Sequence, residues 1–389
     1  MSNIELNIEY KHCALYALSA DPITFGHINI VERVSTIFDE VIVGIGSNPA
    51  KGYLFKLEER LGLAKAALSH LPNVRVEAFK GMLVDFALEE GAQVIVKGVR
   101  NSVDFNYEQH LHQVGVSQQA GIDTHILFAD PELAHISSSV VKGIQLEHGL
   151  ISDYVPLAVK AALEAKISNQ VIIGVTGEMA AGKSTFCKKL VAEGKRQKVS
   201  VHHIDADKLG HEIIDGLASP LYQEVRTKLI ALFGSDICVE GKIQRSKIAE
   251  QVFGQPQLLL ELNQIMAKPL MIQLRKSLQG KQGVILLESA LLAENKLLSL
   301  CNNRVLLLRA DKNEMQARLS GRGYSEDNAK QRTSTQFDWH KKQKCINKQI
   351  ESSGFGQLWD IDSGVESQFD MNAFVSELAN LKSLRIGAR

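Results

Sequence analysis

The chain lacks an excess of charge of either sign. Its 389 residues contain 44 Lys and Arg against 44 Asp and Glu. No global electrostatic field would therefore attract nucleic acid or an anionic membrane, and we expect neither as a partner. Any site for an anion must be built locally from a few residues.

Paired cysteines and long hydrophobic runs are also missing. The five cysteines are scattered singly with no CxxC pair, which argues against a disulfide framework or a structural zinc site and favours a reducing cytoplasm. The N-terminal segment MSNIELNIEYKH is polar and has no apolar signal core, and no hydrophobic run reaches membrane-spanning length. We expect a soluble, cytoplasmic protein.

What the chain does contain is length and a regular alternation of elements. At 389 residues it exceeds the size at which one core keeps growing, so two domains are expected. Short β-rich runs alternate with helical patterns, which predicts βαβ units and parallel sheets. The strands are expected at 13–18, 40–46, 74–79, 92–97 and 124–129, then at 171–175, 199–204, 283–288 and 304–309. Helices are expected at 30–38, 57–71, 83–91, 104–120 and 156–167. A polar break at Ser168-Asn169 predicts domains at 1–168 and 169–389.

The segment VIIGVTGEMAAGKST, residues 171–185, is a predicted strand that runs into a complete phosphate-binding loop. Its GxxxxGK[ST] spacing lets backbone N–H groups curl around a phosphate, while Lys183 reaches the β/γ-phosphates and Ser184 can bind Mg²⁺. A helical run follows it, as this motif requires. We therefore predict ATP binding by Gly177, Glu178, Met179, Ala180, Ala181, Gly182, Lys183, Ser184 and Thr185.

A second anion site is indicated after the first strand, in SADPITFGH. Thr24 and His27 are three residues apart at a predicted helix start, where free N–H groups and the helix dipole favour a phosphate. In HISSSVVKGI, Ser137, Ser138 and Ser139 precede another helical run; this pattern predicts either a plain N-cap or a second phosphate cradle.

These N-terminal motifs carry a resemblance to a known family. TFGH matches the (H/T)xGH signature of nucleotidyltransferases, and DPITFGH, NPAK, GMLVDFA, VKGVRNSVDFNYE and ISSSVVK together resemble phosphopantetheine adenylyltransferase over residues 12–165. The resemblance implies a Rossmann-like fold and transfer of an adenylyl group from ATP to 4′-phosphopantetheine. It implies catalysis by His27 and Thr24, ATP binding by Ser19, Arg100, Glu108 and the three serines, and phosphopantetheine binding by Lys51, Met82, Leu83 and Lys97. The sequence departs from the family's GTFDP at Leu18 and Ala20, and HQVGVSQQ replaces an MNR-containing helix segment.

An acceptor site for the C-terminal phosphate loop is indicated by HIDADKLGHE. In extended chain Asp205 and Asp207 would point to one face and suit a general base with a contact to Mg²⁺; a turn and helix cap is the alternative. Arg318 and Arg322 lie four apart on a predicted helix and could close over phosphates as a lid.

The C-terminal half resembles dephospho-coenzyme A kinase over residues 170–364, through VTGEMAAGKST, HIDADKLGHEI, KIQRSKIAEQVFGQPQ and LLAEN. The resemblance implies a P-loop kinase sheet with a helical lid and acceptor region, and phosphorylation of the ribose 3′-hydroxyl of dephospho-coenzyme A. Asp207 takes the base position, and Asp205, Arg245, Arg318 and Arg322 are implied at the acceptor and phosphates. Lys268-Pro269 and Ala290-Leu291-Leu292 replace the family's His-Pro and Pro-Leu-Leu.

Together the halves imply the last two steps of coenzyme A synthesis, with Mg²⁺ at both sites and a homo-oligomer formed through the N-terminal domain. Two alternatives stay open: a nicotinamide mononucleotide adenylyltransferase fused to a ribosylnicotinamide kinase, and a kinase with an inactive N-terminal binding module.

His202, His203 and His211 are expected on a strand and a helix face, because no Cys or carboxylate stands at metal-ligand spacing. Trp339 to Lys344 predict a solvated helix.

Overall fold

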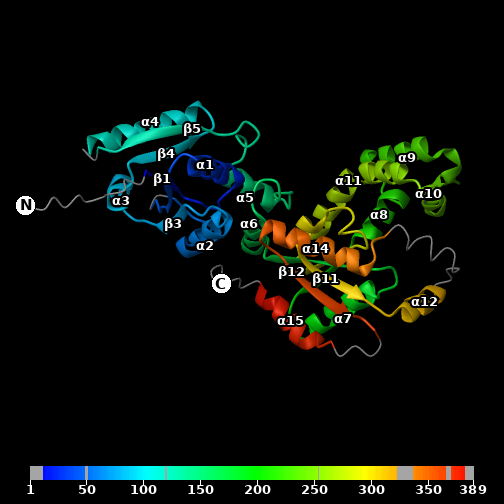
Figure 1. Cartoon of the computed structure of the whole chain (residues 1–389). Coiled ribbons are helices and arrows are strands. Elements are labelled where there is room, and N and C mark those ends of the chain that lie inside the picture. The colour runs from blue at the N-terminus through cyan, green and yellow to red at the C-terminus, as the bar shows by residue number, and fades with distance from the viewer. Residues whose placement is uncertain are drawn as a thin grey trace, which may run out of the picture. The chain divides into compact units, whose positions relative to one another are not determined.

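The computed structural model describes residues 12–48, 51–118, 121–252, 254–321, 336–364 and 369–381. They divide into two compact units, both drawn in Figure 1. The N-terminal unit runs to Gln145 and resumes over Leu150–Leu163; the C-terminal unit takes Leu146–Gly149 and continues from Glu164. Helix α6 (Leu157–Leu163) passes directly into the π-helix η1 (Glu164–Ser168), so Asn169 alone separates it from the next strand.

The N-terminal unit is built on a parallel sheet of five strands in the order β3-β2-β1-β4-β5. The strands are β1 (Cys13–Leu18), β2 (Glu40–Ile45), β3 (Val74–Ala78), β4 (Val94–Val99) and β5 (Asp123–Phe128). All five predicted strands are therefore confirmed. The central strand β1 pairs with both β2 and β4, so the chain reverses its direction of winding beside β1. Ligand sites in such sheets form at this switch point, beyond the strands' carboxyl ends.

Besides α6, the described helices of this unit are α1 (Phe25–Ser35), α2 (Leu57–Leu68), α3 (Leu83–Glu89), α4 (Ser102–Ser117) and α5 (Ser138–Leu146). Helix α4 starts where Asn101 accepts a hydrogen bond from Asp104 N at 2.9 Å, an ordinary N-cap. No residue of α4 is buried, which leaves one whole face of this helix open.

The C-terminal unit has a second parallel sheet of five strands, in the order β12-β11-β6-β10-β7. Its strands are β6 (Gln170–Gly177), β7 (Val201–Asp205), β10 (Gly283–Glu288), β11 (Arg304–Arg309) and β12 (Gln357–Asp362). The strands predicted at 171–175, 199–204, 283–288 and 304–309 are confirmed. Strand β12 was not predicted, because its sequence QLWDID carries two aspartates; it is stable here as an edge strand paired along all of β11.

Two hydrophobic clusters sandwich this sheet. On one face α7 (Lys183–Arg196) and α15 (Met371–Asn380) pack side by side (Figure 1). The other face is covered by α14 (Trp339–Ser353) and the end of α11 (Pro256–Leu278). A helical lobe with its own core adjoins the sheet and contains α8 (Ala206–Asp215), α9 (Pro220–Phe233), α10 (Arg245–Val252), most of α11 and the short hairpin β8 (Cys238–Val239) and β9 (Lys242–Ile243). Elsewhere in the described part of this unit lie the helices η2 (Ser235–Ile237), η3 (Leu298–Cys301) and α12 (Lys312–Ser320).

The helix at Trp339 was predicted correctly, but its description as solvated is wrong for Trp339, which packs against the hydrophobic cluster on the face of the sheet that α14 covers, and for Lys342. The Lys342 side chain is 0% exposed and forms an ion pair with Glu294. Its Nζ also donates to the carbonyl of Ala290 at 2.6 Å. Within the described part of the chain, no helix is long and apolar enough to cross a membrane.

Candidate active sites

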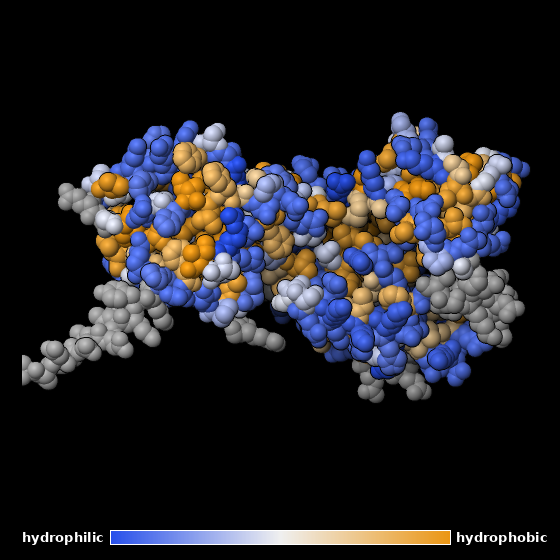
Figure 2. Space-filling view, turned by 45° about the horizontal axis from the view of Figure 1, so that its top comes forward, coloured by the Kyte–Doolittle hydropathy of each residue, from blue (hydrophilic) through white to orange (hydrophobic). Residues whose placement is uncertain are grey.

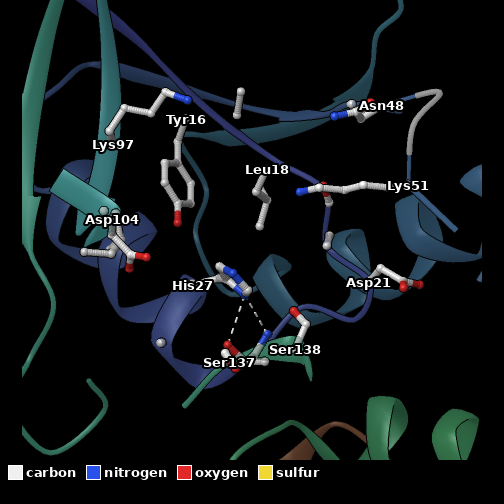
Figure 3. Close-up of a pocket in the computed structure, with 18 of the residues that line it drawn as sticks. Tyr16, Leu18, Asp21, His27, Asn48, Lys51, Lys97, Asp104, Ser137 and Ser138 are labelled. Atoms are coloured by element: carbon white, nitrogen blue, oxygen red, sulfur yellow. Dashed lines mark hydrogen bonds between the residues drawn. The ribbon is translucent and has the colours of Figure 1, made fainter. Parts of the chain in front are cut away.

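The N-terminal unit holds a cavity of about 870 Å³ at the carboxyl ends of β1, β2 and β4. Figure 3 shows His27 in the middle of this cavity, with Ser137 and Ser138 to one side and Lys51 and Lys97 on the other. These side chains therefore share one cavity at one end of the sheet.

The geometry of Thr24 and His27 fixes which ring nitrogen carries the proton. The backbone N–H of Thr24 donates to His27 Nδ1 at 3.1 Å, and Thr24 Oγ1 lies 3.0 Å from the same nitrogen. Because Nδ1 accepts this bond, the neutral imidazole carries its proton on Nε2. Burial and the nearby positive charge of Arg100 lower the pKa of His27 to about 4. The ring is thus a neutral hydrogen-bond donor at physiological pH.

Asp21 connects the first strand end to two other elements. Its carboxylate accepts from Lys142 Nζ at 2.8 Å and from the backbone N–H groups of Leu54 and Phe55 at 3.1 and 2.9 Å. Burial favours a higher pKa for Asp21, but these bonds outweigh it and lower the pKa. Ser138 Oγ adds a bond to the carbonyl of Pro22 at 2.8 Å. The ISSS segment is therefore held against the TFGH turn.

Arg60 is a buried cation that sequence reasoning missed. Its guanidinium donates to the carbonyls of Ser19 and Gly46 at 2.5 and 2.7 Å and to Ser47 Oγ at 2.6 Å. It also stacks 4.1 Å from the ring centroid of Tyr53. Arg60 thus ties together the ends of β1 and β2 at the cavity wall. The only sequence signal was its place in LFKLEER.

Most of the predicted N-terminal site residues line this cavity. They are Ser19, Thr24, His27, Lys51, Leu83, Lys97, Arg100, Glu108, Ser137, Ser138 and Ser139. Met82 is the exception: it is the N-cap of α3, is 42% exposed and does not line the cavity. Lys97 and Glu108, which were assigned to different substrates, form an ion pair at 3.0 Å.

Arg100 projects from the end of β4 toward the serine segment. Its Nε donates to Asp104 at 2.9 Å and its Nη1 to the carbonyl of Ile136 at 3.3 Å. The guanidinium of Arg100 therefore connects α4 with the loop residue Ile136, which directly precedes Ser137. Leu18, at the end of β1, also lines the cavity.

The second site surrounds the phosphate loop of the C-terminal unit. Gly177 has φ 152°, and a Cβ atom there would lie 2.3 Å from the carbonyl oxygen of Leu308 on β11. Gly182 is the N-cap of α7 with φ 86°, a left-handed conformation that glycine adopts without strain. Lys183 Nζ donates to the carbonyls of Gly177 and Glu178 at 3.2 and 2.9 Å. The loop is folded as the motif predicts.

Glu288, at the end of β10, is a second residue that sequence reasoning missed. Ser184 Oγ donates to Glu288 Oε1 at 2.7 Å, and His203 Nε2 lies 2.7 Å from Glu288 Oε2. Burial favours a higher pKa for Glu288, but the bonds from His203 and Ser184 lower it, so the carboxylate is ionised. The available signal was a single acidic residue ending the hydrophobic run GVILL.

Asp205 and Asp207 both line a second cavity, which lies beside the phosphate loop. An extended chain was predicted to point them to one face, but the chain has another conformation. The chain is extended only as far as Asp205, which ends β7 and caps α8 by accepting from Lys208 N at 3.0 Å; Asp207 already lies in the first turn of α8. Although Asp207 is accessible from the cavity, desolvation by the cavity walls and the charge of Asp205 raise its pKa. Asp205 is therefore the helix cap that the alternative predicted, whereas Asp207 lies at the cavity, where its role stays a prediction.

The three arginines predicted at the second site differ in their positions. Arg245, the first residue of α10, lines the cavity and forms an ion pair with Asp215 at 3.4 Å. Arg318 does not line it but donates to the carbonyl of Ala180 in the phosphate loop at 3.1 Å. Helix α12, which carries Arg318, is described as far as Ser320, and Arg322 lies outside the described residues, so the predicted shared helix stays a prediction.

This second cavity, of about 560 Å³, extends from the phosphate loop into the helical lobe. The lobe contributes an apolar wall, made by Ile214, Ile248, Ala249, Val252, Leu259 and Leu262. His211, expected only on a helix face, lies on α8 and also lines this cavity. The site thus joins a charged end for phosphates to an apolar end.

Known families match the two units separately. Residues 16–144 match the cytidylyltransferase-like family model, and residues 171–356 match that of dephospho-CoA kinase. A phosphopantetheine adenylyltransferase from Syntrophomonas wolfei is 42% identical over 156 residues, which cover 40% of this chain and 97% of that protein.

Solved structures resemble the chain more weakly. A protein from Thermus thermophilus has a TM-score of 0.41 and 22% identity, with 56% of this chain and 98% of that chain covered. The NadR protein with NAD and AMP-PNP has a TM-score of 0.32 and 12% identity, with 98% of each chain covered. On the sequence matches, the chain belongs to the phosphopantetheine adenylyltransferase family in its N-terminal half, to which a dephospho-CoA kinase domain is joined.

Proposed function

We propose that this chain catalyses the last two steps of coenzyme A synthesis. Its N-terminal unit joins ATP to 4′-phosphopantetheine and releases pyrophosphate, giving dephospho-coenzyme A. Its C-terminal unit transfers the γ-phosphoryl group of a second ATP to the ribose 3′-hydroxyl and releases ADP. The observation that carries the proposal is the pair of separate nucleotide cavities, one in each unit. The product of the first is the substrate of the second.

In the first cavity the substrate phosphate is the nucleophile, so the protein supplies alignment and stabilisation of charge rather than a covalent intermediate. His27 Nε2–H donates to the phosphate that is attacked, and Thr24 both holds the ring through Nδ1 and presents the N-terminus of α1 to the same group. Ser19, Arg100, Glu108 and the serines from Ser137 to Ser139 bind ATP. Lys51, Leu83 and Lys97 bind 4′-phosphopantetheine. Met82 is not assigned to this substrate, because it does not line the cavity.

In the second cavity Asp207 accepts the proton of the ribose hydroxyl as that oxygen attacks the γ-phosphorus. Its raised pKa suits this role, because a base works best when its pKa approaches the working pH. The loop from Gly177 to Thr185 binds ATP, with Lys183 on the transferred phosphate. Asp205 and Arg245 bind the acceptor, whose uncharged arm lies along the apolar wall of the helical lobe. Arg318 steadies the loop through Ala180.

The Ser184–Glu288 pair fits a magnesium ion. Both side chains present oxygen atoms, the ligands that Mg²⁺ prefers, and these atoms lie 2.7 Å apart beside Lys183. Ser184 would bind the ion directly, and Glu288 would hold it directly or through water. When bound, Mg²⁺ neutralises the charge that develops on the ATP phosphates. For the first cavity, Mg²⁺ as a partner of ATP is part of the same proposal.

The nicotinamide alternative has no comparable support, since the C-terminal match is to dephospho-CoA kinase. A thermal-shift comparison separates the two functions. ATP with 4′-phosphopantetheine or dephospho-coenzyme A should raise the melting temperature, whereas nicotinamide mononucleotide and ribosylnicotinamide should not. Stabilisation by the nicotinamide compounds alone would contradict the proposal. The alternative of an inactive N-terminal module conflicts with the complete first cavity around His27.

The N-terminal unit is proposed to form a homo-oligomer through α4 and the edge strand β5. Exposed hydrophobic residues gather there, and Figure 2 shows hydrophobic residues among hydrophilic ones on this side of the unit. They are Val103, Phe105, Tyr107, Leu111, Val114, Val116 and Phe128. Light scattering should give more than one chain per particle, and Val114→Glu should reduce it to a monomer. The cytoplasmic location is supported by five cysteines that are all free.

A further inference from the structure

Three side chains of different chemistry meet beneath the phosphate loop. They are Cys187 on α7, His203 on β7 and Glu288 at the end of β10. One potential ligand atom of each (Sγ, a ring nitrogen and a carboxylate oxygen) lies within 4.8 Å of the other two. The functions proposed above use Glu288 but leave the Cys187 thiol without a role.

The fold itself holds this cluster together. Cys187 follows Ser184 by three residues, so both side chains leave α7 on the side that faces the sheet. Strands β7 and β10 are neighbours, with His203 opposite Leu286 and Asp205 opposite Glu288. Cys187 is 0% exposed and belongs to the hydrophobic cluster between α7 and the sheet. Packing therefore fixes the position of the sulfur over the two strands.

We propose that Cys187, His203 and Glu288 form a binding site for Zn²⁺. Thiolate, imidazole and carboxylate are the ligands that Zn²⁺ takes in proteins. Two ligand atoms on a tetrahedral zinc ion lie about 3.5 Å apart, so these side chains need to move by only about 1 Å to close on it. His203 already presents Nε2 to Glu288, which is the nitrogen that would bind the ion.

Binding of Zn²⁺ changes the protonation of Cys187 and the buried charge of the cluster. Burial and the nearby charges of Glu288 and Asp205 raise the pKa of the Cys187 thiol, so it is protonated without metal. Zn²⁺ displaces that proton to solvent and binds the resulting thiolate. Two positive charges then meet the negative charges of the thiolate and Glu288, which leaves no net charge buried. Glu288 lines the second cavity, so this cavity gives the ion a route to the cluster.

Occupation of this site would change the phosphate loop. Glu288 now accepts a hydrogen bond from Ser184 Oγ, the proposed magnesium ligand. A zinc ion would draw the carboxylate toward Cys187 and His203 and away from Ser184. This consequence rests on the proposed kinase function: zinc inhibits phosphorylation of dephospho-coenzyme A and leaves adenylyl transfer in the other unit unchanged.

Cobalt spectroscopy on the reduced full-length protein tests the site without any substrate. Co²⁺ should produce the near-ultraviolet charge-transfer band of a cobalt thiolate, saturating at one ion per chain, and Zn²⁺ should abolish the band. Cys187→Ala should lose it, whereas Cys301→Ala should keep it; Cys301 is equally buried but lies outside the cluster. His203→Gln should weaken binding at least about 100-fold, since loss of a mere second-shell partner costs about 10–100-fold. A missing band in the parent protein, or an unchanged one in folded Cys187→Ala, overturns the proposal. If Cys187→Ala does not fold, unchanged cobalt affinity in His203→Gln overturns it.

A second measurement separates this site from the proposed function. Zinc should inhibit coenzyme A formation from dephospho-coenzyme A by the parent protein and by Cys301→Ala, but not by Cys187→Ala. Equal inhibition of all three would overturn the coupling to Ser184. If the cobalt band appears and the zinc-free protein, supplied with Mg²⁺ and ATP, makes no coenzyme A from dephospho-coenzyme A, the kinase assignment fails while the metal site stands.

Discussion

Replacement of Asp207 by asparagine isolates one proton acceptor without a change of shape. Asp207 lies in the second cavity with Lys183, Asp205 and Glu288, and Ser289 Oγ is 3.5 Å from its Oδ1. An amide keeps these contacts but cannot take the proton of the ribose hydroxyl. Since the phosphate loop from Gly177 to Ser184 is untouched, the affinity for ATP should stay the same.

The expected size of the loss follows from the environment of this carboxylate. General bases contribute about 10²–10⁴ to rate. Because cavity desolvation and the charge of Asp205 raise its pKa, Asp207 should fall in the upper part of this range, about 10³–10⁴. That corresponds to about 4–5.5 kcal/mol in the activation free energy. The ionised form of Asp207 is the active one, so the turnover of the parent protein should fall as the pH is lowered. Because the pKa of Asp207 is raised, the midpoint of this fall should lie at a higher pH than the pKa of an exposed aspartate.

The assay measures phosphorylation of supplied dephospho-coenzyme A under saturating ATP, beside an ATP binding titration. Asp205→Asn is the comparison variant: asparagine also caps α8, so the helix should persist, and with dephospho-coenzyme A at saturation its loss of turnover should be smaller than that of Asp207→Asn. Asp207→Asn should lose turnover and retain ATP binding. Parental turnover in Asp207→Asn with a large loss in Asp205→Asn would refute the assignment of the base, and so would an acidic limb that persists unchanged in Asp207→Asn.

Three further outcomes are expected. His27→Ala should lower adenylyl transfer by about 10²–10³ and spare phosphorylation of supplied dephospho-coenzyme A, because one preorganised donor is lost; parental adenylyl transfer would contradict the first site. The imidazole of His27, with a pKa of about 4, should show no protonation by NMR between pH 8 and about pH 5.5 in the ligand-free protein, and a titration centred near 6.5 would contradict its described environment. Lys342→Met should lower the free energy of unfolding of the kinase unit by about 3–5 kcal/mol in denaturant titrations, since Glu294 stays buried without its cation. Lys342→Met with Glu294→Met should recover much of this loss, and a loss below about 1 kcal/mol in the single variant would show that the pair acts like a surface salt bridge.

Features with a local sequence signal were predictable. The buried strands are continuous hydrophobic runs, and TFGH and the phosphate loop each place their residues within a few positions of one another. Strand β12 was missed because an edge strand with two aspartates gives no hydrophobic run; its stability comes from pairing with β11. The geometry of Asp205 and Asp207 was misjudged because the helix begins one residue before Asp207.

Contacts between distant positions could not be predicted in this way. Arg60, Lys142 and Glu288 reach partners that lie 41, 121 and 104 residues away in the sequence. Likewise Lys342 looked like a surface charge until the fold placed Glu294 beside it. The sequence does not indicate whether a single charged residue is buried or which residue it contacts. Both are determined only by the packing of the helices on the sheet.

The central claim is that two cavities on one chain perform consecutive reactions. A time course with 4′-phosphopantetheine and ATP, its products resolved by mass, tests it most directly. The parent protein should form dephospho-coenzyme A with pyrophosphate and convert it to coenzyme A with ADP, whereas Lys183→Ala should accumulate dephospho-coenzyme A, because the cation on the β/γ-phosphates is gone. Absence of dephospho-coenzyme A and coenzyme A from the parent reaction, or parental amounts of coenzyme A from Lys183→Ala, would contradict the account.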